Sequence, residues 1–213
     1  MDRQAHWEHV YRTMSAEQVS WFQSEATLSR QIIERSTPSR TARIVDIGAG
    51  ASTLVDGLLA SGYRNLTVVD LSAAALALAQ KRIGDAAAFV KWLAADVLTT
   101  PFEPSTFDLW HDRAVFHFLT DAAERAQYVE QVRRAVRPGG HVLVATFAED
   151  GPVRCSGLQV ARYSPSTLHA EFGAGFRLID SHRELHTTPS GAAQAFTYCV
   201  CVVDPQVPSH NAA

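Results

Sequence analysis

Short hydrophobic runs alternate with helix-like segments along most of this chain. Ile44, Val45 and Ile47 form a β-branched run, and further hydrophobic runs cover residues 65–70, 89–94 and 141–147. Continuous runs of this length are typical of strands buried on both faces of a parallel sheet. Between the runs, residues 52–61, 73–82 and 121–136 are predicted to form helices. This order of elements predicts a doubly wound α/β fold.

The two ends of the chain have different patterns. Residues 3–36 have helical spacing with a break near Met14, and Trp7, Val10 and Tyr11 fall on one helical face. Near the other end, residues 175–185 and 193–203 alternate in polarity and flank a turn through 186–191. We therefore expect N-terminal helices and a C-terminal antiparallel hairpin, with a short helix over 165–172 before the hairpin.

Composition narrows the class of protein. The chain has 213 residues, of which 46% are hydrophobic and 19% charged, values typical of one globular domain. The net charge of −3 does not favour nucleic acid as a partner, and no hydrophobic run is long enough to span a bilayer. Three cysteines make no disulfide framework, and no cluster has metal-ligand spacing, so we expect a cytoplasmic protein without a metal.

A glycine turn follows the first strand. Gly48 and Gly50 allow the backbone to turn sharply and to approach a ligand closely. The dinucleotide-binding pattern would require glycine where Thr53 stands, and Asp46 precedes the turn. A carboxylate at that place repels a pyrophosphate and attracts an ammonium group. The sequence therefore favours a nucleoside that carries an amino acid over NAD.

The run Asp46-Ile47-Gly48-Ala49-Gly50 resembles the first motif of the class I S-adenosylmethionine-dependent methyltransferases. This resemblance covers about residues 42–203 and implies a Rossmann-like, seven-stranded, mostly parallel sheet with helices on both faces. It also implies S-adenosylmethionine as the cofactor and a methyltransferase domain over 41–203. Residues 1–40 are then expected to form a helical lid, and 204–213 a flexible tail.

The resemblance assigns further cofactor contacts. Asp70 ends the second strand, where it is expected to accept hydrogen bonds from the ribose hydroxyls, beside Leu71. Asp96 is expected to accept from the adenine amino group, with the backbone of Val97 against the ring. The alternatives are a helix cap for Asp70 and a solvated loop carboxylate for Asp96. At the glycine turn, Ala49 completes the expected contacts.

Residues 106–119 resemble the fourth strand of this family and the segment after it, and they are unusually polar at the end of the strand. In the functional interpretation His111 or Asp112 contacts the cofactor, while Arg113 and His117 face the substrate. Both histidines are candidate general bases because an unperturbed imidazole titrates near neutrality. In the structural alternative, Asp112 caps a helix and pairs with Arg113 on the surface.

The aromatic residues of the N-terminal segment resemble a lid over the methyl group. Trp7 and Tyr11 are expected to contact the cofactor, and Trp21 and Phe22 the substrate. The long connection over 148–168 is expected to contribute Cys155 and Tyr163 to the substrate pocket.

Three functions are compatible with these residues. We favour methyl transfer to a small-molecule acceptor, with a thiol, sulfide or other soft nucleophile as the leading chemistry, by a monomer or homodimer. The alternatives are a protein lysine methyltransferase and a non-catalytic subunit that binds S-adenosylmethionine.

Overall fold

The computed structural model describes residues 2–205, and a single seven-stranded sheet forms its centre. The strand order is β3-β2-β1-β4-β5-β9-β8, in which the first five strands are parallel and β9 runs antiparallel to both neighbours. This arrangement confirms the predicted fold class and the C-terminal hairpin. The strands are β1 (Arg43–Ile47), β2 (Asn65–Asp70), β3 (Val90–Ala94), β4 (Phe107–Arg113), β5 (Val136–Phe147), β8 (Phe176–Thr187) and β9 (Ala193–Val203).

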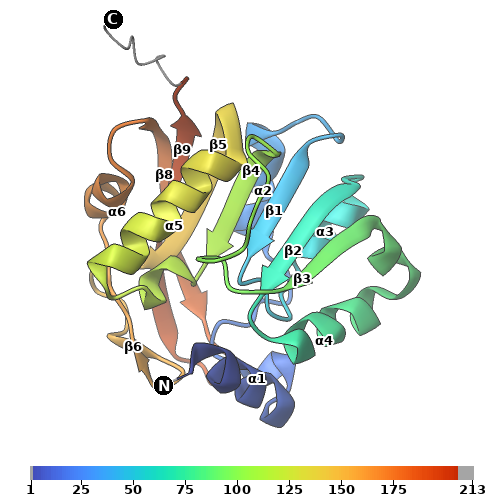
Figure 1. Cartoon of the computed structure of the whole chain (residues 1–213). Coiled ribbons are helices and arrows are strands. Elements are labelled where there is room, and N and C mark those ends of the chain that lie inside the picture. The colour runs from blue at the N-terminus through green and yellow to red at the C-terminus, as the bar shows by residue number, and fades with distance from the viewer. Residues whose placement is uncertain (1, 206–213) are drawn as a thin grey trace, which may run out of the picture.

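Helices cover both faces of the sheet. One face carries α2 (Thr27–Ser36), α3 (Leu54–Ala60) and α4 (Ala73–Ile83), and the other carries α5 (Ala122–Ala135) and α6 (Pro165–Phe172). In Figure 1, α5 and α6 lie in front of the sheet, and α1 (Arg3–Thr13) lies below it, where β1, β2 and β4 end. The N-terminal helix is therefore placed at the edge where parallel α/β sheets bind ligands.

Alternation along the strands separates two hydrophobic cores. Leu109 packs with the α2–α3 side and Trp110 with the α5–α6 side, and both are fully buried. Successive side chains of a strand point to opposite faces, so a strand covered on both faces has no polar side. This double burial is the reason for the continuous hydrophobic runs in the sequence.

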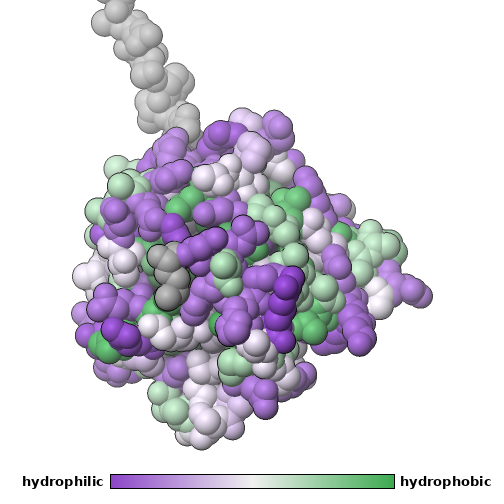
Figure 2. Space-filling model, turned by 60° about the horizontal axis from the view of Figure 1, so that its bottom comes forward, coloured by the Kyte–Doolittle hydropathy of each residue, from purple (hydrophilic) through white to green (hydrophobic). Residues whose placement is uncertain are grey.

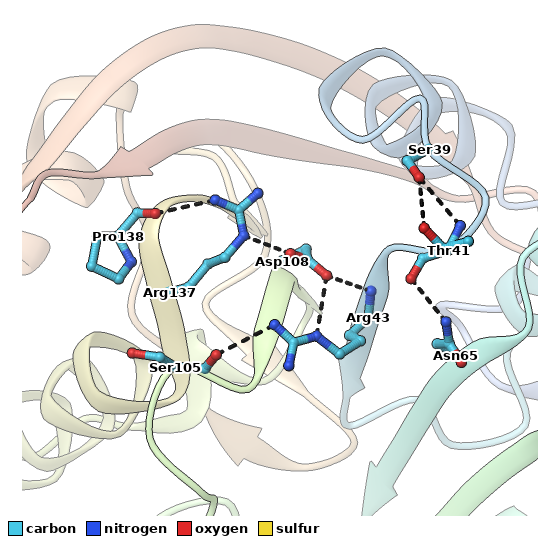
Figure 3. Close-up of polar contacts among 8 residues, drawn as sticks. All are labelled: Ser39, Thr41, Arg43, Asn65, Ser105, Asp108, Arg137 and Pro138. Atoms are coloured by element: carbon cyan, nitrogen blue, oxygen red, sulfur yellow. Dashed lines mark hydrogen bonds and ion pairs between the residues drawn. The ribbon is translucent and has the colours of Figure 1, made fainter.

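A polar cluster ties together the opposite edge of the sheet. Asp108 accepts the backbone N–H of Arg43 at 2.7 Å and the Nε–H of Arg137 at 2.5 Å, which connects β1, β4 and β5 (Figure 3). Nearby, the Asn65 side chain donates to the backbone oxygen of Thr41 at 2.8 Å. Charged residues at this edge therefore fix the register of the strands, while the other edge stays available for a site.

The N-terminal segment differs most from its prediction. The expected helical region over 3–36 divides into α1, the short 3-10 turn η1 (Ala16–Gln18) and α2. Residues between η1 and α2 instead run beside β8, where His186 Nε2 lies 2.8 Å from the backbone oxygen of Ser20. Tertiary contacts with a strand far along the chain therefore override the local helical pattern.

The other short elements connect this framework. They are η2 (Gly84–Phe89), η3 (Phe116–Phe118) and the small hairpin of β6 (Arg154–Cys155) and β7 (Leu158–Gln159). Strand β5 begins at Val136, before the hydrophobic run at 141–147, and its register with β4 shifts between Phe107 and Leu109. Of the tail predicted from Asp204, residues 206–213 lie outside the described residues.

Candidate active site

A cavity opens at the C-terminal ends of β1, β2 and β4, beneath α1. Figure 2 looks onto this end of the molecule, where the outer surface is mainly hydrophilic with small hydrophobic areas. The cavity itself is lined mostly by hydrophobic and aromatic residues. Its lining includes Trp7, Tyr11, Trp21, Ile47, Gly48, Val69, Asp70, Leu71, Ala95, Asp96, Val97, Arg113, Ala114, Val115, Phe118, Leu119 and Cys155.

The glycine turn reaches this cavity through Gly48. Gly48 and Gly50 have φ angles of 61° and 54°, which glycine adopts without strain. A Cβ atom on Gly48 would lie 1.8 Å from Val115 Cγ2, and one on Gly50 would lie 2.1 Å from the Tyr11 hydroxyl. Glycine is therefore required at both positions by the backbone angles and by close neighbours.

Asp70, the last residue of β2, lines the first cavity. Its Oδ2 accepts the N–H of Gly50 at 2.8 Å and its Oδ1 accepts the N–H of Ser72 at 2.7 Å. Burial raises the pKa of Asp70 to about 6, against the hydrogen bonds that favour its ionised form. The Ser72 hydroxyl caps α4 by accepting the N–H of Ala75 at 3.1 Å, so Asp70 is free of that role. Each carboxylate oxygen retains capacity for a further donor.

Asp96 lies on the same side of the cavity as Asp70. Its Oδ1 accepts the N–H of Leu98 at 2.9 Å, and Leu71 and Val97 line the wall beside it. The residues predicted to bind the adenosine half of the cofactor are thus brought together in one cavity.

A second cavity adjoins the first behind Tyr11 and Trp21, which line both. The Trp21 Nε1–H donates to the Tyr11 hydroxyl at 3.2 Å, so the two side chains form a partial partition, and Gly48 and Arg113 line the cavities on both sides of it. Phe22, Ala49, Gly48 and Arg113 also line this second cavity.

Asp46 and His111 line the second cavity as a buried pair. His111 Nδ1 lies 2.6 Å from Asp46 Oδ1, and His111 Nε2 lies 3.0 Å from the Ser29 hydroxyl of α2. Both ring nitrogens of His111 are therefore engaged. Asp46 Oδ2 is buried and has no hydrogen-bond partner among the described residues. Such an oxygen is costly unless a ligand or water satisfies it.

Arg113 lies where the two cavities meet. Its Nε–H donates to the Tyr198 hydroxyl at 3.0 Å, and its two terminal nitrogens donate to Glu184 Oε2 and to the backbone oxygen of Trp21, each at 3.3 Å. Its guanidinium carbon also lies 4.1 Å from the centre of the Phe196 ring. The sequence analysis missed Ser29, Glu184 and Tyr198 because they come from other elements, and nothing in their local sequence marks them.

The N-terminal helix closes the first cavity. The Glu8 carboxylate accepts the Ser72 hydroxyl at 2.8 Å and the N–H of Ala74 at 3.2 Å, at the start of α4. Trp7 packs edge-on against Phe118, with ring centroids 5.1 Å apart, and Arg3 pairs with Glu124 of α5. Helix α1 is thus fastened to elements on both sides of the opening.

Three sequence predictions conflict with this geometry. Asp112 is fully buried and accepts the Tyr128 hydroxyl and the N–H groups of Val115 and Phe116, so it stabilises the turn after β4, away from either cavity. His117 is fully buried, and burial, with a smaller effect of Arg113, lowers its pKa to about 3, which does not suit a general base. Tyr163 packs in the α5–α6 core and lines neither cavity.

Cys155 reaches the first cavity from the β6–β7 hairpin. It is 5% exposed, and burial raises the pKa of its thiol to about 11. The thiol is therefore neutral near pH 7. All three cysteines are buried and free. Within residues 2–205, no group of three or more His, Cys, Asp and Glu side chains is arranged to hold a metal ion, and no helix there is long and hydrophobic enough to cross a membrane.

Comparison with known proteins identifies the fold. The sequence profile of the family described as "Methyltransferase domain" matches residues 45–144. An uncharacterized methyltransferase of Mycobacterium bovis is 30% identical over 120 residues, which are 54% of this chain and 56% of that protein. The chain thus spans little more than half the length of the curated relatives it matches.

Two solved structures have the same fold over nearly the whole chain. The Burkholderia thailandensis 1,6-didemethyltoxoflavin-N1-methyltransferase, with bound S-adenosylhomocysteine, has a TM-score of 0.71 and 20% identity over 95% of this chain and 87% of its own. A structure that concerns conversion of a disulfide bond into a thioacetal group during echinomycin biosynthesis has a TM-score of 0.75 and 19% identity, and the match covers 95% of this chain and 92% of that protein. In its glycine turn, its strand order and the family match over residues 45–144, this chain is similar to the class I S-adenosylmethionine-dependent methyltransferases, and it has their fold.

Proposed function

We propose that this protein transfers a methyl group from S-adenosylmethionine to a small-molecule acceptor. The observation that carries the proposal is the meeting of Asp70, Asp96 and the glycine turn in one cavity at the C-terminal ends of the strands. Asp70 would accept from the ribose hydroxyls, and Asp96 and Val97 would contact the adenine. Asp46, with its free oxygen, would hold the ammonium group in the adjoining cavity.

The cofactor supplies an electrophilic methyl group on a cationic sulfur. A lone pair of the acceptor forms the new bond to this carbon as the carbon–sulfur bond breaks, and the sulfur leaves as a neutral thioether. The protein contributes mainly alignment and exclusion of water, which can supply a large part of the rate. The aromatic walls formed by Trp7, Trp21 and Phe118 serve both purposes.

The acceptor side of the cavity favours a soft, small nucleophile. Trp7, Trp21, Phe118 and Cys155 line it, whereas the acids Asp70 and Asp96 are on the side proposed for adenosine. A lysine ammonium would enter this region without a carboxylate to pair with. The wall chemistry therefore supports a thiol or sulfide over a protein lysine.

Neither of the two predicted bases is available in the described part of the chain, which supports the same choice. His117 is buried with its pKa lowered to about 3, and both nitrogens of His111 are engaged. A thiol with an ordinary pKa of about 8.5 already contains some thiolate at neutral pH, whereas a lysine with a pKa of about 10.4 must first lose a proton. An acceptor that ionises by itself fits a site of this kind. The monomer or homodimer state stays a prediction.

The test is a labelled-methyl assay over an acceptor panel. The protein is incubated with methyl-labelled S-adenosylmethionine and, separately, with sulfide, an aryl thiol, small carboxylic acids and lysine peptides. We expect label on the sulfur compounds, and its loss in Asp70→Ala but not in the distant surface variant Arg177→Ala. Label on the peptides alone would contradict the acceptor class. Tight cofactor binding without any turnover would instead indicate a non-catalytic subunit.

A further inference from the structure

The second cavity is lined by a negative and a positive side chain, which suits a zwitterionic ligand. Among the residues described there, Asp46 supplies a carboxylate and Arg113 a guanidinium. Asp46 Oδ2 is buried without a partner, although the protein satisfies the other oxygen through His111. A ligand that brought only an anion would leave this oxygen unsatisfied. A ligand that carries an ammonium and a carboxylate group can pair with both side chains.

The strand register places the two charges on the same wall. Asp46 of β1 pairs with His111 of β4, and Arg113 is two residues farther along β4. Side chains two residues apart leave the same face of a strand about 7 Å apart. The carboxylate and the guanidinium therefore flank the space between the glycine turn and the Tyr11–Trp21 partition.

Arg113 retains donors for such a ligand. A guanidinium carries five N–H groups, and three hydrogen bonds to Tyr198, Glu184 and Trp21 are present. One N–H group remains on each terminal nitrogen, and two parallel donors can bind a carboxylate in a bidentate way. The side chain is 9% exposed, so a hydrogen bond made there is shielded from water.

We propose that Arg113 binds the α-carboxylate of the cofactor's amino-acid end, next to the ammonium group held by Asp46, and that Glu184 and Tyr198 are the positioning residues that aim it. This assignment rests on the proposed function, and it replaces the sequence-based expectation that Arg113 faces the methyl acceptor. Arg113 then acts in cofactor affinity first, and in turnover only through the placement of the cofactor.

The C-terminal hairpin fixes the orientation of Arg113. Glu184 Oε2 accepts from both Arg113 and the Tyr198 hydroxyl, the latter at 2.7 Å, while Glu184 Oε1 accepts from Gln23 at 2.9 Å. Glu184 does not line either cavity, so it holds the guanidinium from behind. Strands β8 and β9, which are remote from the glycine turn in sequence, thereby determine the geometry of the cofactor site.

The test compares three ligands by calorimetry. S-adenosylhomocysteine carries both charged groups, decarboxylated S-adenosylmethionine keeps only the ammonium of that end, and methylthioadenosine lacks the amino-acid end. Arg113→Met should weaken S-adenosylhomocysteine about 10- to 100-fold, as expected for a charged hydrogen bond. It should leave the other two ligands within about twofold. Asp46→Asn should weaken both ammonium compounds and spare methylthioadenosine.

Positioning is tested with a matched pair of tyrosines. Tyr198→Phe removes the hydroxyl that aims Arg113, and should selectively weaken S-adenosylhomocysteine. Tyr63→Phe removes another buried hydroxyl, which donates to the backbone oxygen of Thr37 at 2.6 Å away from both cavities, and should spare all three ligands. Methylthioadenosine binding reports whether each variant is folded.

Two results would overturn the assignment. If Arg113→Met weakens decarboxylated S-adenosylmethionine as much as S-adenosylhomocysteine, the guanidinium does not bind the carboxylate. If it leaves all three affinities unchanged and lowers only turnover with the acceptor, Arg113 belongs to the acceptor site and the proposed methyl transfer still stands. Failure of the unaltered protein to bind S-adenosylhomocysteine would remove both proposals.

Discussion

At the scale of the residue, burial decides which polar groups can take part in chemistry. Asp70, Asp112 and His117 are all shielded from water, yet only Asp70 lines a cavity. The Asp112 carboxylate accepts two backbone N–H groups of a turn, and the His117 ring packs against two aromatic rings. The same residue types therefore serve structure or ligand binding according to which space they face.

The raised pKa of Asp70 predicts a pH-dependent affinity for the cofactor product. Burial raises the pKa of Asp70 to about 6, and only the ionised carboxylate accepts from both ribose hydroxyls. Binding of S-adenosylhomocysteine should therefore be strongest above pH 6. Below pH 6 the affinity should fall, and the decrease should approach about tenfold per pH unit. Calorimetry between pH 5 and about 8 measures this. Asp70→Asn should bind more weakly and lose the pH dependence, and an unchanged profile in that variant would contradict the assignment.

At the scale of the element, the N-terminal helix lies over the first cavity and is held partly by contacts near the surface. Glu8 at the start of α4 and the Trp7–Phe118 pair hold α1 over the first cavity. These contacts are polar or partly exposed, unlike the buried strands beneath them. Elements held in this way open locally before the fold does, so we propose that α1 controls cofactor exchange.

Loosening α1 should speed the release of S-adenosylhomocysteine. Glu8→Ala removes two hydrogen bonds to α4, and a loss of about 1 kcal/mol corresponds to a roughly fivefold faster dissociation. Stopped-flow fluorescence of Trp7 and Trp21 measures the rate. The exposed Glu17→Ala is the matched control, because η1 lies outside the α1–α4 contact. Equal rates in both variants would show that α1 does not limit release.

At the scale of the whole molecule, buried ionisable groups make stability depend on pH. The pKa of His117 is lowered from 6.5 to about 3 by burial, so the unfolded chain binds a proton that the folded chain excludes. Acidification from about pH 6.5 toward pH 3 therefore favours unfolding. Asp70 and Asp112, whose pKa values burial raises to about 6, act in the opposite sense over part of this range.

A difference measurement isolates the histidine. His117→Gln removes the titrating ring, so the unfolding free energy of the original protein relative to this variant should fall by about 1.4 kcal/mol per pH unit below pH 6.5. Urea unfolding at a series of pH values measures it. A difference that stays constant with pH would mean that His117 takes up its proton over the same pH range in the folded and the unfolded protein.

The sequence by itself determined the elements and the fold class. The runs at residues 65–70 and 165–172 coincide with β2 and α6, because strands buried on both faces and a capped helix have strong local patterns. The position of the glycine turn and of the acids at the strand ends could also be predicted from the sequence, since the ends of parallel strands meet at one edge of the sheet. Asp46, Asp70 and Asp96 could thus be grouped before the structure was known.

Only the tertiary structure decided what the remaining polar residues do. His111, Asp112 and Arg113 are consecutive, but strand alternation sends Asp112 to the α5 side, toward Tyr128, and the other two to the opposite side. The partners Ser29, Glu184 and Tyr198 come from α2, β8 and β9, and no local pattern connects them to β4. Hydrophobic spacing is a property of neighbours in sequence, whereas hydrogen-bond partners and burial depend on segments that folding alone brings together.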